Sequence, residues 1–342
     1  MKALPKALVI GSPQGLVPDT VWAQFSSGFE VRMYDFPTTE AFYQSMQKDG
    51  SCHGISTIVR LGLNLPPGIE KVGQGWTKRA LPHLPSTLRL IVNFGHGYDE
   101  EDVPALKARG IEFANTTGGS ESTATVGLFL IIASLRQLSR YERMLRNDQF
   151  LPALRDSAKT AIDPFGKKLG VIGMGSIGQT VARQAAVLGM EIHCVDRPNL
   201  RKMVDLAGTT GLPPLVLCSN IEQLVASVDC LILTCSYSSE THHFLSQHLF
   251  GKMRPGIRIV NIARGKCIDE EELCDAIESG IVGGVGLDVH YDEPRVNPRL
   301  LKYECVTLLP HVAGLTHDSM SKHAQLALQT AENFFREPPL SQ

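Results

Sequence analysis

Short apolar runs rich in β-forming residues alternate with amphipathic stretches along almost the whole chain. This alternation is typical of parallel strands joined by helices that cover both faces of a sheet. We predict strands at 7–10, 30–34, 56–59, 88–92, 111–114, 169–172, 191–195, 230–234, 258–261, 285–288 and 305–308. The predicted fold class is therefore α/β.

The predicted strands fall into two sets, which indicates two doubly wound parallel-sheet domains. A length of 342 residues also favours two domains, because one ordinary core does not grow to that size. Between the sets, 120–146 is predicted to form one long helix, followed by a looser connection at 147–165. A last helical pattern covers 317–335 and is broken by Glu-Pro-Pro at 337–339.

The charge pattern argues against nucleic acid and membrane partners. The 33 basic and 35 acidic residues give a net charge of -2, and neither sign forms a long run. The most apolar stretch, 126–135, is about half the roughly 20 residues that a membrane helix needs. Small molecules are the expected partners.

The eight cysteines are scattered without CxxC spacing, which indicates reduced thiols and a cytoplasmic location. Cys235 and the pair His242-His243 also lack the spacing of metal ligands, so we expect no metal site.

A glycine-rich segment follows the predicted strand at 169–172 and opens the next helical pattern. Its spacing is GxGxxG, in which the first glycine permits a tight turn, the second lets the backbone approach a pyrophosphate, and the third allows close helix–sheet packing. We expect a dinucleotide here, with its phosphates at the helix N-terminus. The contact residues would be Gly173, Met174, Gly175, Ser176, Ile177 and Gly178.

An acidic residue stands where a dinucleotide-binding unit requires one. Asp196 ends the next predicted strand, 18 residues after Gly178, and can bind both hydroxyls of the adenosine ribose. Its charge would repel a 2′-phosphate, which favours NAD. Arg197 comes next and would attract that phosphate, so NADP stays open as an alternative.

Three polar residues follow strands of the second set: Arg264, Glu293 and His311. Residues just past the carboxyl ends of parallel strands line the ligand crevice of an open sheet. Reduction of a 2-oxo acid needs a hydride donor, a proton donor and a cation for the carboxylate. His311 would be the general acid, Glu293 would stabilise its protonated form, and Arg264 would bind the substrate. Taken singly, each has a plainer explanation as a loop residue or surface ion pair.

The motifs together resemble the D-2-hydroxyacid dehydrogenase family. The matching phrases, in order after the glycine loop, are Asn261-Ile-Ala-Arg-Gly, Asp269-Glu-Glu-Glu-Leu, Gly286-Leu-Asp-Val-His-Tyr-Asp-Glu-Pro and Leu309-Pro-His-Val-Ala-Gly. Within the family, the segment Leu84-Pro-Ser-Thr-Leu is similar to the corresponding segment of fungal D-mandelate dehydrogenases and of glyoxylate or hydroxypyruvate reductases. The resemblance implies NAD(P)H-dependent reduction of a 2-oxo acid to the D-2-hydroxy acid.

This resemblance also implies a domain arrangement. A flavodoxin-like substrate domain would contain 1–119, completed by the C-terminal helix at 317–342, and a Rossmann NAD-binding domain would contain 120–316. Homodimerisation through the cofactor domain and the long helix is implied as well.

The family further implies residue roles outside the catalytic trio. Backbone amides of Gly95, His96 and Gly97 would bind the substrate carboxylate, and the loop with Leu61 and Gly62 would touch the substrate side chain. Further expected cofactor contacts are Thr125, Cys235, Ile262, Asp288, which would hold the nicotinamide carboxamide, and Gly314.

Two residues depart from the family pattern: Gly127 stands where many relatives have an acid, and His96 stands where a small or aliphatic residue is common. Two alternatives share the fold. Formate dehydrogenases pair the catalytic histidine with glutamine, unlike Glu293, and NAD-binding corepressors act through protein contacts.

Overall fold

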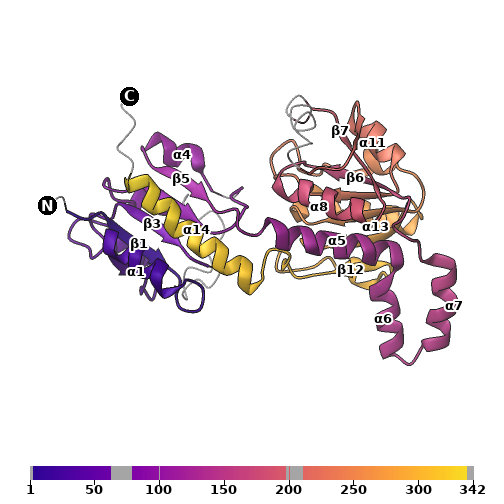
Figure 1. Ribbon diagram of the computed structural model, residues 1–342, viewed down its shortest axis with the longest axis horizontal. Helices are drawn as coiled ribbons and strands as arrows, with labels where there is room; N and C mark the ends of the chain where they lie inside the picture. Colours follow the sequence, from indigo (N-terminus) through magenta and orange to yellow (C-terminus); the bar gives the residue numbers. More distant parts are fainter. Residues whose placement is uncertain (1–2, 63–78, 100, 198–199, 201–210, 337–342) are drawn as a thin grey trace. The chain divides into compact units, whose positions relative to one another are not determined.

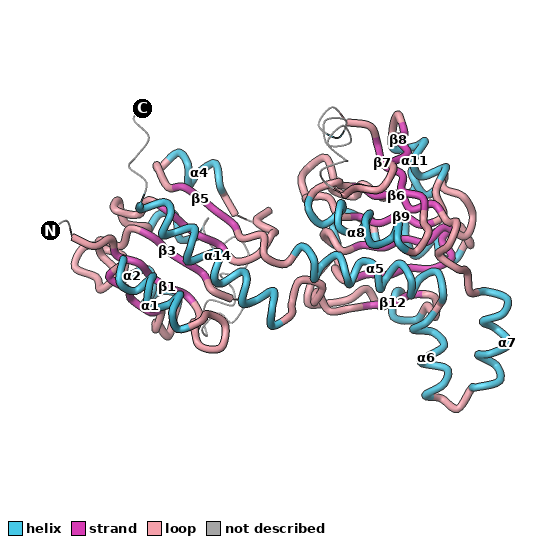
Figure 2. Tube along the Cα trace, in the orientation of Figure 1, coloured by secondary structure: helices cyan, strands magenta, loops and turns pink. Residues whose placement is uncertain are grey.

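The computed structural model describes residues 3–62, 79–99, 101–197, 200 and 211–336. The chain divides into two compact units, one with Met1–Gly119 and Leu315–Gln342 and the other with Ser120–Gly314. Each unit contains its own parallel sheet with helices packed on it (Figures 1 and 2). The predicted α/β class with two doubly wound sheets is confirmed. The predicted break at 337–339 lies outside the described residues, as does the rest of the expected C-terminal segment up to 342.

The first unit is built on a five-stranded sheet in the order β2-β1-β3-β4-β5. All neighbouring strands are parallel, and this order is the flavodoxin-like arrangement. Its strands are β1 (Lys6–Ile10), β2 (Glu30–Met33), β3 (Thr57–Arg60), β4 (Leu90–Asn93) and β5 (Glu112–Asn115). Its helices are α1 (Asp19–Gly28), α2 (Thr39–Ser45), α4 (Val103–Ala108) and α14 (His317–Arg336), with a 3-10 turn at Leu81–His83.

Alternate residues of these strands face opposite sides of the sheet, so each side has its own apolar core. Leu8 and Ile58 pack with Phe42 of α2 on one side. Val9 and Val59 pack on the other side, in the cluster that contains apolar residues of α1 and α14. Because α14 lies against β3 and β4, the last helix completes the core of the first unit (Figure 1).

The second unit is built on a seven-stranded parallel sheet in the order β12-β11-β10-β9-β6-β7-β8. Its strands are β6 (Lys168–Ile172), β7 (Glu191–Val195), β8 (Leu215–Cys218), β9 (Cys230–Leu233), β10 (Ile257–Asn261), β11 (Val282–Leu287) and β12 (Val306–Leu308). Its helices are α5 (Ser120–Arg136), α6 (Leu138–Arg146), α7 (Phe150–Thr160), α8 (Ser176–Val187), α11 (Ile221–Ser227), α12 (Gln247–Phe250) and α13 (Glu270–Glu278), with 3-10 turns at Gly265–Cys267 and Leu300–Lys302.

Strand β8 is the one strand of the second sheet that we did not predict. It is only four residues long, follows Pro213-Pro214, and leaves Val216 and Leu217 exposed at the edge of the sheet. Its four apolar residues are the shortest run by which a strand can be recognised, so the signal in the sequence is weak.

The prediction of one helix over 120–146 is wrong. Helix α5 ends at Arg136, Gln137 adopts a left-handed conformation with φ of 57°, and α6 continues at an angle of 71°. The side-chain amide of Gln137 donates to the carbonyl of Gly283 in β11 at 3.0 Å. This contact ties the break to the sheet, because a non-glycine residue in this conformation needs support from its surroundings.

The expectation of a looser connection at 147–165 is also wrong, because it contains helix α7. Helices α6 and α7 form a hairpin, which Figure 1 shows extending from the second sheet. The two helices are joined by an ion pair between Arg140 and Asp156 at 3.3 Å and by a hydrogen bond between the hydroxyls of Tyr141 and Thr160 at 2.6 Å.

Gly127 lies on the buried side of α5, where the helix crosses the second sheet. A Cβ at this position would stand 2.8 Å from Cδ1 of Ile262 and 3.1 Å from Cδ1 of Ile232. The space that an acidic side chain would need at position 127 is therefore filled by the core, which explains the departure from the family pattern.

Within the described ranges, no single helix is long and apolar enough to cross a membrane. Helices α5 and α6 reach the required length and hydropathy only when taken together, and the bend at Gln137 separates them.

We expect Gly127→Val to lower the free energy of unfolding by about 1 to 3 kcal/mol, because it overpacks a filled core. Gly28→Ala is the matched control, since an added Cβ there meets nothing within 4 Å. Urea denaturation of both variants would test this. An unchanged midpoint for Gly127→Val would show that α5 can move away from the sheet.

Candidate active site

The glycine-rich loop between β6 and α8 combines two packed glycines with one open glycine. Gly173 has φ of 97°, and a Cβ there would stand 2.6 Å from the backbone nitrogen of Cys235. A Cβ on Gly178 would stand 2.0 Å from the carbonyl oxygen of Gly173, whereas one on Gly175 would meet nothing within 4 Å. Gly175 also caps α8, so open space lies at a helix N-terminus. This arrangement fits a pyrophosphate.

Asp196 directly follows β7, the strand next to β6, as a ribose-binding acid should. Its backbone N–H donates to the carbonyl of Cys218 at 2.7 Å, which fixes the end of the strand. Its side chain is partly exposed and that of Arg197 is exposed. Both side chains are thus accessible, and their placement is compatible with NAD and with NADP.

The other residues expected to contact the cofactor differ in whether their side chain or only their backbone is accessible. Thr125 is exposed on α5 and donates its hydroxyl to the carbonyl of Glu121 at 2.8 Å. Gly314 ends the second unit, close to Thr123. The side chain of Ile262 packs in the core, so only its backbone could contact a cofactor.

Cys235 lies beside the glycine loop, with its backbone against Gly173. A hydrogen bond with the thiol of Cys267 and burial raise the pKa of Cys235 well above the ordinary value. Cys235 is therefore a neutral side chain at this edge of the sheet.

His311 and Glu293 form a hydrogen-bonded pair after β12 and β11. Nδ1 of His311 lies 2.8 Å from Oε2 of Glu293, and the backbone N–H of His290 donates to Oε1 at 2.9 Å. Burial raises the pKa of Glu293, but the hydrogen bonds from His311 and His290 outweigh burial and lower it below its ordinary value of 4.5. The carboxylate is therefore ionised at neutral pH and orients the imidazole, which is 47% exposed.

Asp288 fixes the backbone on which His311 stands. Its carboxylate, 1% exposed, accepts the N–H of Val312 at 2.8 Å on one oxygen and that of Ala313 at 3.0 Å on the other. The N–H of His311 donates to the carbonyl of Asp288 at 2.7 Å. These three bonds hold His311 at φ of 54°, a conformation that side chains other than glycine adopt infrequently. The predicted contact of Asp288 with a nicotinamide carboxamide remains a prediction.

Arg264 follows β10 on a loop that packs against the loop of Glu293. The side-chain amide of Asn261 donates to the carbonyl of Arg264 at 2.8 Å. A Cβ on Gly265 would stand 2.0 Å from the carbonyl of His290, so only glycine allows this approach. Because β10, β11 and β12 are neighbours, Arg264, Glu293 and His311 follow three adjacent strands at one edge of the sheet.

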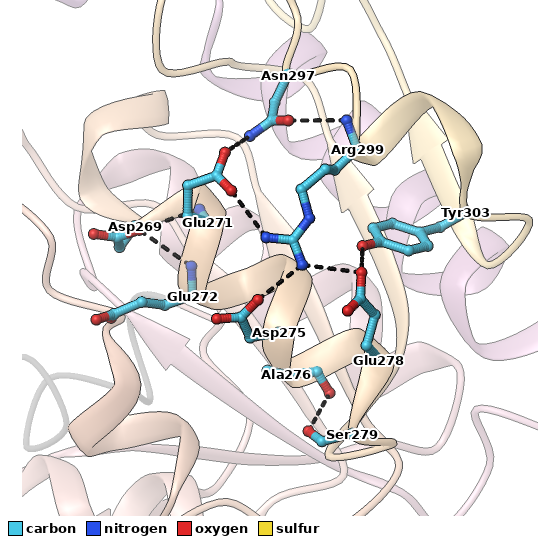
Figure 3. Close-up of polar contacts among 10 residues, drawn as sticks. All are labelled: Asp269, Glu271, Glu272, Asp275, Ala276, Glu278, Ser279, Asn297, Arg299 and Tyr303. Atoms are coloured by element: carbon cyan, nitrogen blue, oxygen red, sulfur yellow. Dashed lines mark hydrogen bonds and ion pairs between the residues drawn. The ribbon is translucent and has the colours of Figure 1, made fainter.

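An ion-pair cluster anchors the chain after Glu293 to α13 (Figure 3). The guanidinium of Arg299 contacts carboxylates of Glu271, Asp275 and Glu278 at 2.9, 2.8 and 2.9 Å. Asn297 donates its side-chain N–H to Glu271 at 2.7 Å. Hydrogen bonds from Arg299 and Asn297 lower the pKa of Glu271, so this carboxylate is ionised at neutral pH.

In the first unit, the loop expected to bind the substrate carboxylate follows β4. The N–H of Gly95 donates to Oγ1 of Thr116 at 3.0 Å, and the side-chain amide of Asn115 donates to the carbonyl of His96 at 2.8 Å. The amide of Gly95 thus already has an acceptor within the protein. The contact of the amides of Gly95, His96 and Gly97 with the substrate carboxylate remains a prediction.

Leu61 and Gly62 belong to the loop that is predicted to touch the substrate side chain, and this contact remains a prediction. Leu61 is fully buried in the core of the first unit with Val9 and Val59. Gly62 lies beside Met320 of α14, and its carbonyl accepts a hydrogen bond from Arg60 at 3.3 Å.

Known proteins resemble this chain over most of its length. Residues 128–313 match the NAD binding domain of D-isomer specific 2-hydroxyacid dehydrogenases. A 4-methyl-2-oxopentanoate reductase of Aspergillus oryzae is 32% identical, covering 95% of this chain and 93% of that protein. The chain belongs to the D-isomer specific 2-hydroxyacid dehydrogenase family. It is therefore an NAD(P)-dependent oxidoreductase that acts on a CH–OH group.

Further relatives of this dehydrogenase span several substrates. The apo structure of D-mandelate dehydrogenase from Rhodotorula graminis has a TM-score of 0.87 and 31% identity, and the match covers 97% of this chain and 95% of that one. A glyoxylate/hydroxypyruvate reductase of Arabidopsis thaliana is 33% identical, covering 77% of this chain and 78% of that protein.

Several residues that support the site were not predicted from the sequence. One is His290, whose Nε2 donates to the carbonyl of Leu309 at 2.8 Å. It lies inside the motif that contains Glu293, so a supporting role could have been predicted for it. Thr116 and His323 carried no local signal, because they are far apart in the sequence and meet only in the fold. Among the described residues, no group of three or more His, Cys, Asp or Glu side chains could hold a metal ion.

The lowered pKa of Glu293 predicts a pH-dependent contribution to stability. A carboxylate whose folded pKa lies below its unfolded value stabilises the fold above that unfolded value, near 4.5, and loses the effect as the pH falls through the folded value. We expect the unfolding free energies of wild type and Glu293→Gln to differ at pH 6, and the difference to disappear as the pH falls through the lowered pKa of Glu293. Denaturant unfolding at a series of pH values from 6 downward would measure this, and a difference independent of pH would contradict it.

Proposed function

We propose that this dehydrogenase reduces a 2-oxo acid with a branched or aromatic side chain to the D-2-hydroxy acid. The pair formed by His311 and Glu293, beside Arg264, is the observation that carries the proposal. The three residues follow adjacent strands, a hydrogen bond of 2.8 Å joins His311 to Glu293, and the loop of Arg264 packs against the loop of Glu293 at Gly265.

His311 is proposed to donate the proton to the carbonyl oxygen of the substrate. Its Nδ1 is turned to Glu293, so Nε2 is the nitrogen left for the substrate. Glu293 holds the ring in place, and its carboxylate is the partner that pairs with the imidazolium when the ring carries the proton. This division of roles matches general acid catalysis, in which an oriented imidazole supplies the proton as charge develops on the oxygen.

Arg264 is proposed to bind the carboxylate and the carbonyl oxygen of the substrate. A guanidinium is always charged and presents a planar fork of N–H donors that matches a carboxylate. One of these groups donates to the carbonyl of Ala263 at 2.7 Å, which orients the fork from within its own loop.

The glycine loop and Asp196 are proposed to hold the pyrophosphate and the adenosine ribose of the cofactor. When bound, the reduced nicotinamide supplies the hydride. Asp196 favours NADH, while the exposed Arg197 next to it keeps NADPH as the second candidate.

The substrate class is supported by the relatives. The 4-methyl-2-oxopentanoate reductase and the D-mandelate dehydrogenase are named for a branched and an aromatic acid, and their matches cover at least 95% of this chain. The glyoxylate/hydroxypyruvate reductase matches over a smaller share, so a smaller substrate is the alternative.

We expect His311→Asn to lower kcat by about 100- to 10,000-fold, because the variant lacks the proton donor. Oxidation of NADH and of NADPH at 340 nm would be followed with glyoxylate, hydroxypyruvate, 4-methyl-2-oxopentanoate and benzoylformate. His317→Asn, an exposed histidine at the start of α14, is the control. If the wild type is active and His311→Asn keeps the same kcat, His311 is not the proton donor. NADH binding without turnover of any acid would instead favour a binding protein.

A homodimer in the cytoplasm completes the proposal. The α6–α7 hairpin exposes apolar side chains that water disfavours, and a second copy of the chain would cover them. These side chains are Leu138, Leu145, Phe150, Leu151 and Leu154. The cytoplasmic location is supported by eight free cysteines, which suit a reducing compartment.

If this hairpin forms the dimer interface, the double variant Leu151→Asp/Leu154→Asp should be a monomer, because two charges would be buried without partners. Light scattering coupled to gel filtration would give the mass. Val187→Asp, at an exposed apolar position of α8, should leave the mass unchanged. A double variant that still has twice the chain mass of 37.3 kDa would place the interface elsewhere.

A further inference from the structure

His323 is a buried polar residue of α14 that the catalytic scheme does not use. It is 3% exposed and lies in the first unit, beside the loop of Gly95, His96 and Gly97. The close approach of the chain after β5 to α14 depends on Gly118, where a Cβ would stand 2.9 Å from the backbone nitrogen of His323.

A chain of hydrogen bonds runs from the loop to His323. The N–H of Gly95 donates to Oγ1 of Thr116 at 3.0 Å, and this hydroxyl lies 2.6 Å from Nδ1 of His323. The N–H of Gly118 also donates to Nδ1, at 3.3 Å. An amide can only donate, so Nδ1 is an acceptor and carries no proton. The hydroxyl of Thr116 therefore donates to His323, and its oxygen accepts from Gly95.

The imidazole of His323 also supports the side chains of the loop. Its ring lies 4.8 Å from the ring of Phe94 and 5.6 Å, edge to face, from the ring of His96. Three successive loop residues thus depend on one side chain: Phe94 and His96 by ring contact, and Gly95 through Thr116.

The neutral form of His323 is the one that the hydrogen bonds require. Burial, with the nearby His96 and Lys322, lowers the pKa of His323 to about 4. At neutral pH the ring is therefore uncharged, its proton is on Nε2, and the acceptor at Nδ1 is available to Thr116.

We propose that His323, acting through Thr116, is a positioning residue that sets the orientation of the substrate-binding loop. With the Gly95 amide held by Thr116, the backbone that follows is fixed in the one arrangement in which the amides of His96 and Gly97 receive the substrate carboxylate. This inference rests on the proposed function, because it assigns those amides to a 2-oxo acid.

A positioning role of this kind acts on substrate binding more than on the proton transfer. A preformed loop avoids the entropy of ordering the backbone when the substrate arrives. Loss of the support should raise KM for the 2-oxo acid and leave kcat nearly unchanged, since the groups that react lie elsewhere.

The test compares Thr116→Val with Thr116→Ser. Valine has the shape of threonine but neither accepts from Gly95 nor donates to His323, whereas serine keeps the hydroxyl. We expect Thr116→Val to raise KM by about 3- to 10-fold, as for one neutral hydrogen bond, with kcat within about twofold of wild type. Thr116→Ser should restore the wild-type KM. Thr330→Val is the matched control, because it removes a threonine hydroxyl that lies on α14 about two turns after His323 and donates only to the carbonyl of Leu326 within the helix.

A second measurement covers the case in which Thr116→Val fails to fold. His323→Asn keeps an acceptor near the position of Nδ1, and His323→Phe keeps only the ring. The inference requires the asparagine variant to have the lower KM of the two. Nitrogen-15 NMR of the histidines should also show Nδ1 of His323 unprotonated at neutral pH, and a proton on Nδ1 would overturn the proposal.

The possible outcomes separate this inference from the proposed function. If wild type turns over none of the acids, the proposed function fails and the inference fails with it. If wild type is active and Thr116→Val has the wild-type KM, only the role of Thr116 and His323 is overturned. Fluorescence titration with NADH should give the same Kd for all variants, and a weakened Kd would indicate a general structural defect instead of a loop effect.

Discussion

The carboxylate of Asp288 is buried at the end of β11, where a charge without partners would cost several kcal/mol. The amides of Val312 and Ala313 satisfy it, and charge-assisted bonds of this kind are about twice as strong as neutral ones. The chain after β12 must therefore turn back toward β11 at His311. The left-handed backbone of His311 and its distance from Glu293 both follow from that turn.

Much of the fold and the placement of the candidate site could be predicted from the sequence, because the signals are local. Buried parallel strands are continuous apolar runs, and all eleven predicted runs correspond to strands. Ten of them agree within two residues at each end, and β11 begins three residues earlier than predicted. The GxGxxG loop could be predicted because each glycine is needed for a different steric reason: Gly173 and Gly178 leave no room for a Cβ, and Gly175 leaves open space. Arg264, Glu293 and His311 were found because polar residues after strands collect at one edge of a parallel sheet.

The features that were missed depend on contacts between distant segments. Nothing near Gln137 marks the break of the long helix, which depends on the carbonyl of Gly283. The engagement of Gly95 depends on Thr116, and that of Thr116 on His323, 207 residues further along the chain. The sequence alone could not show that the side chain of Leu61 is buried, since a leucine that follows a strand can either pack in the core or contact a substrate.

The first unit is discontinuous in sequence, and this has a consequence for how the chain is made. Its sheet is complete once β5 has left the ribosome, but the face formed by Val9 and Val59 waits for α14, which is synthesised after the whole second unit. During that interval an apolar face is open to water or to other chains. The second unit, whose segments are contiguous, can fold first, so the first unit to be translated is the last to be finished.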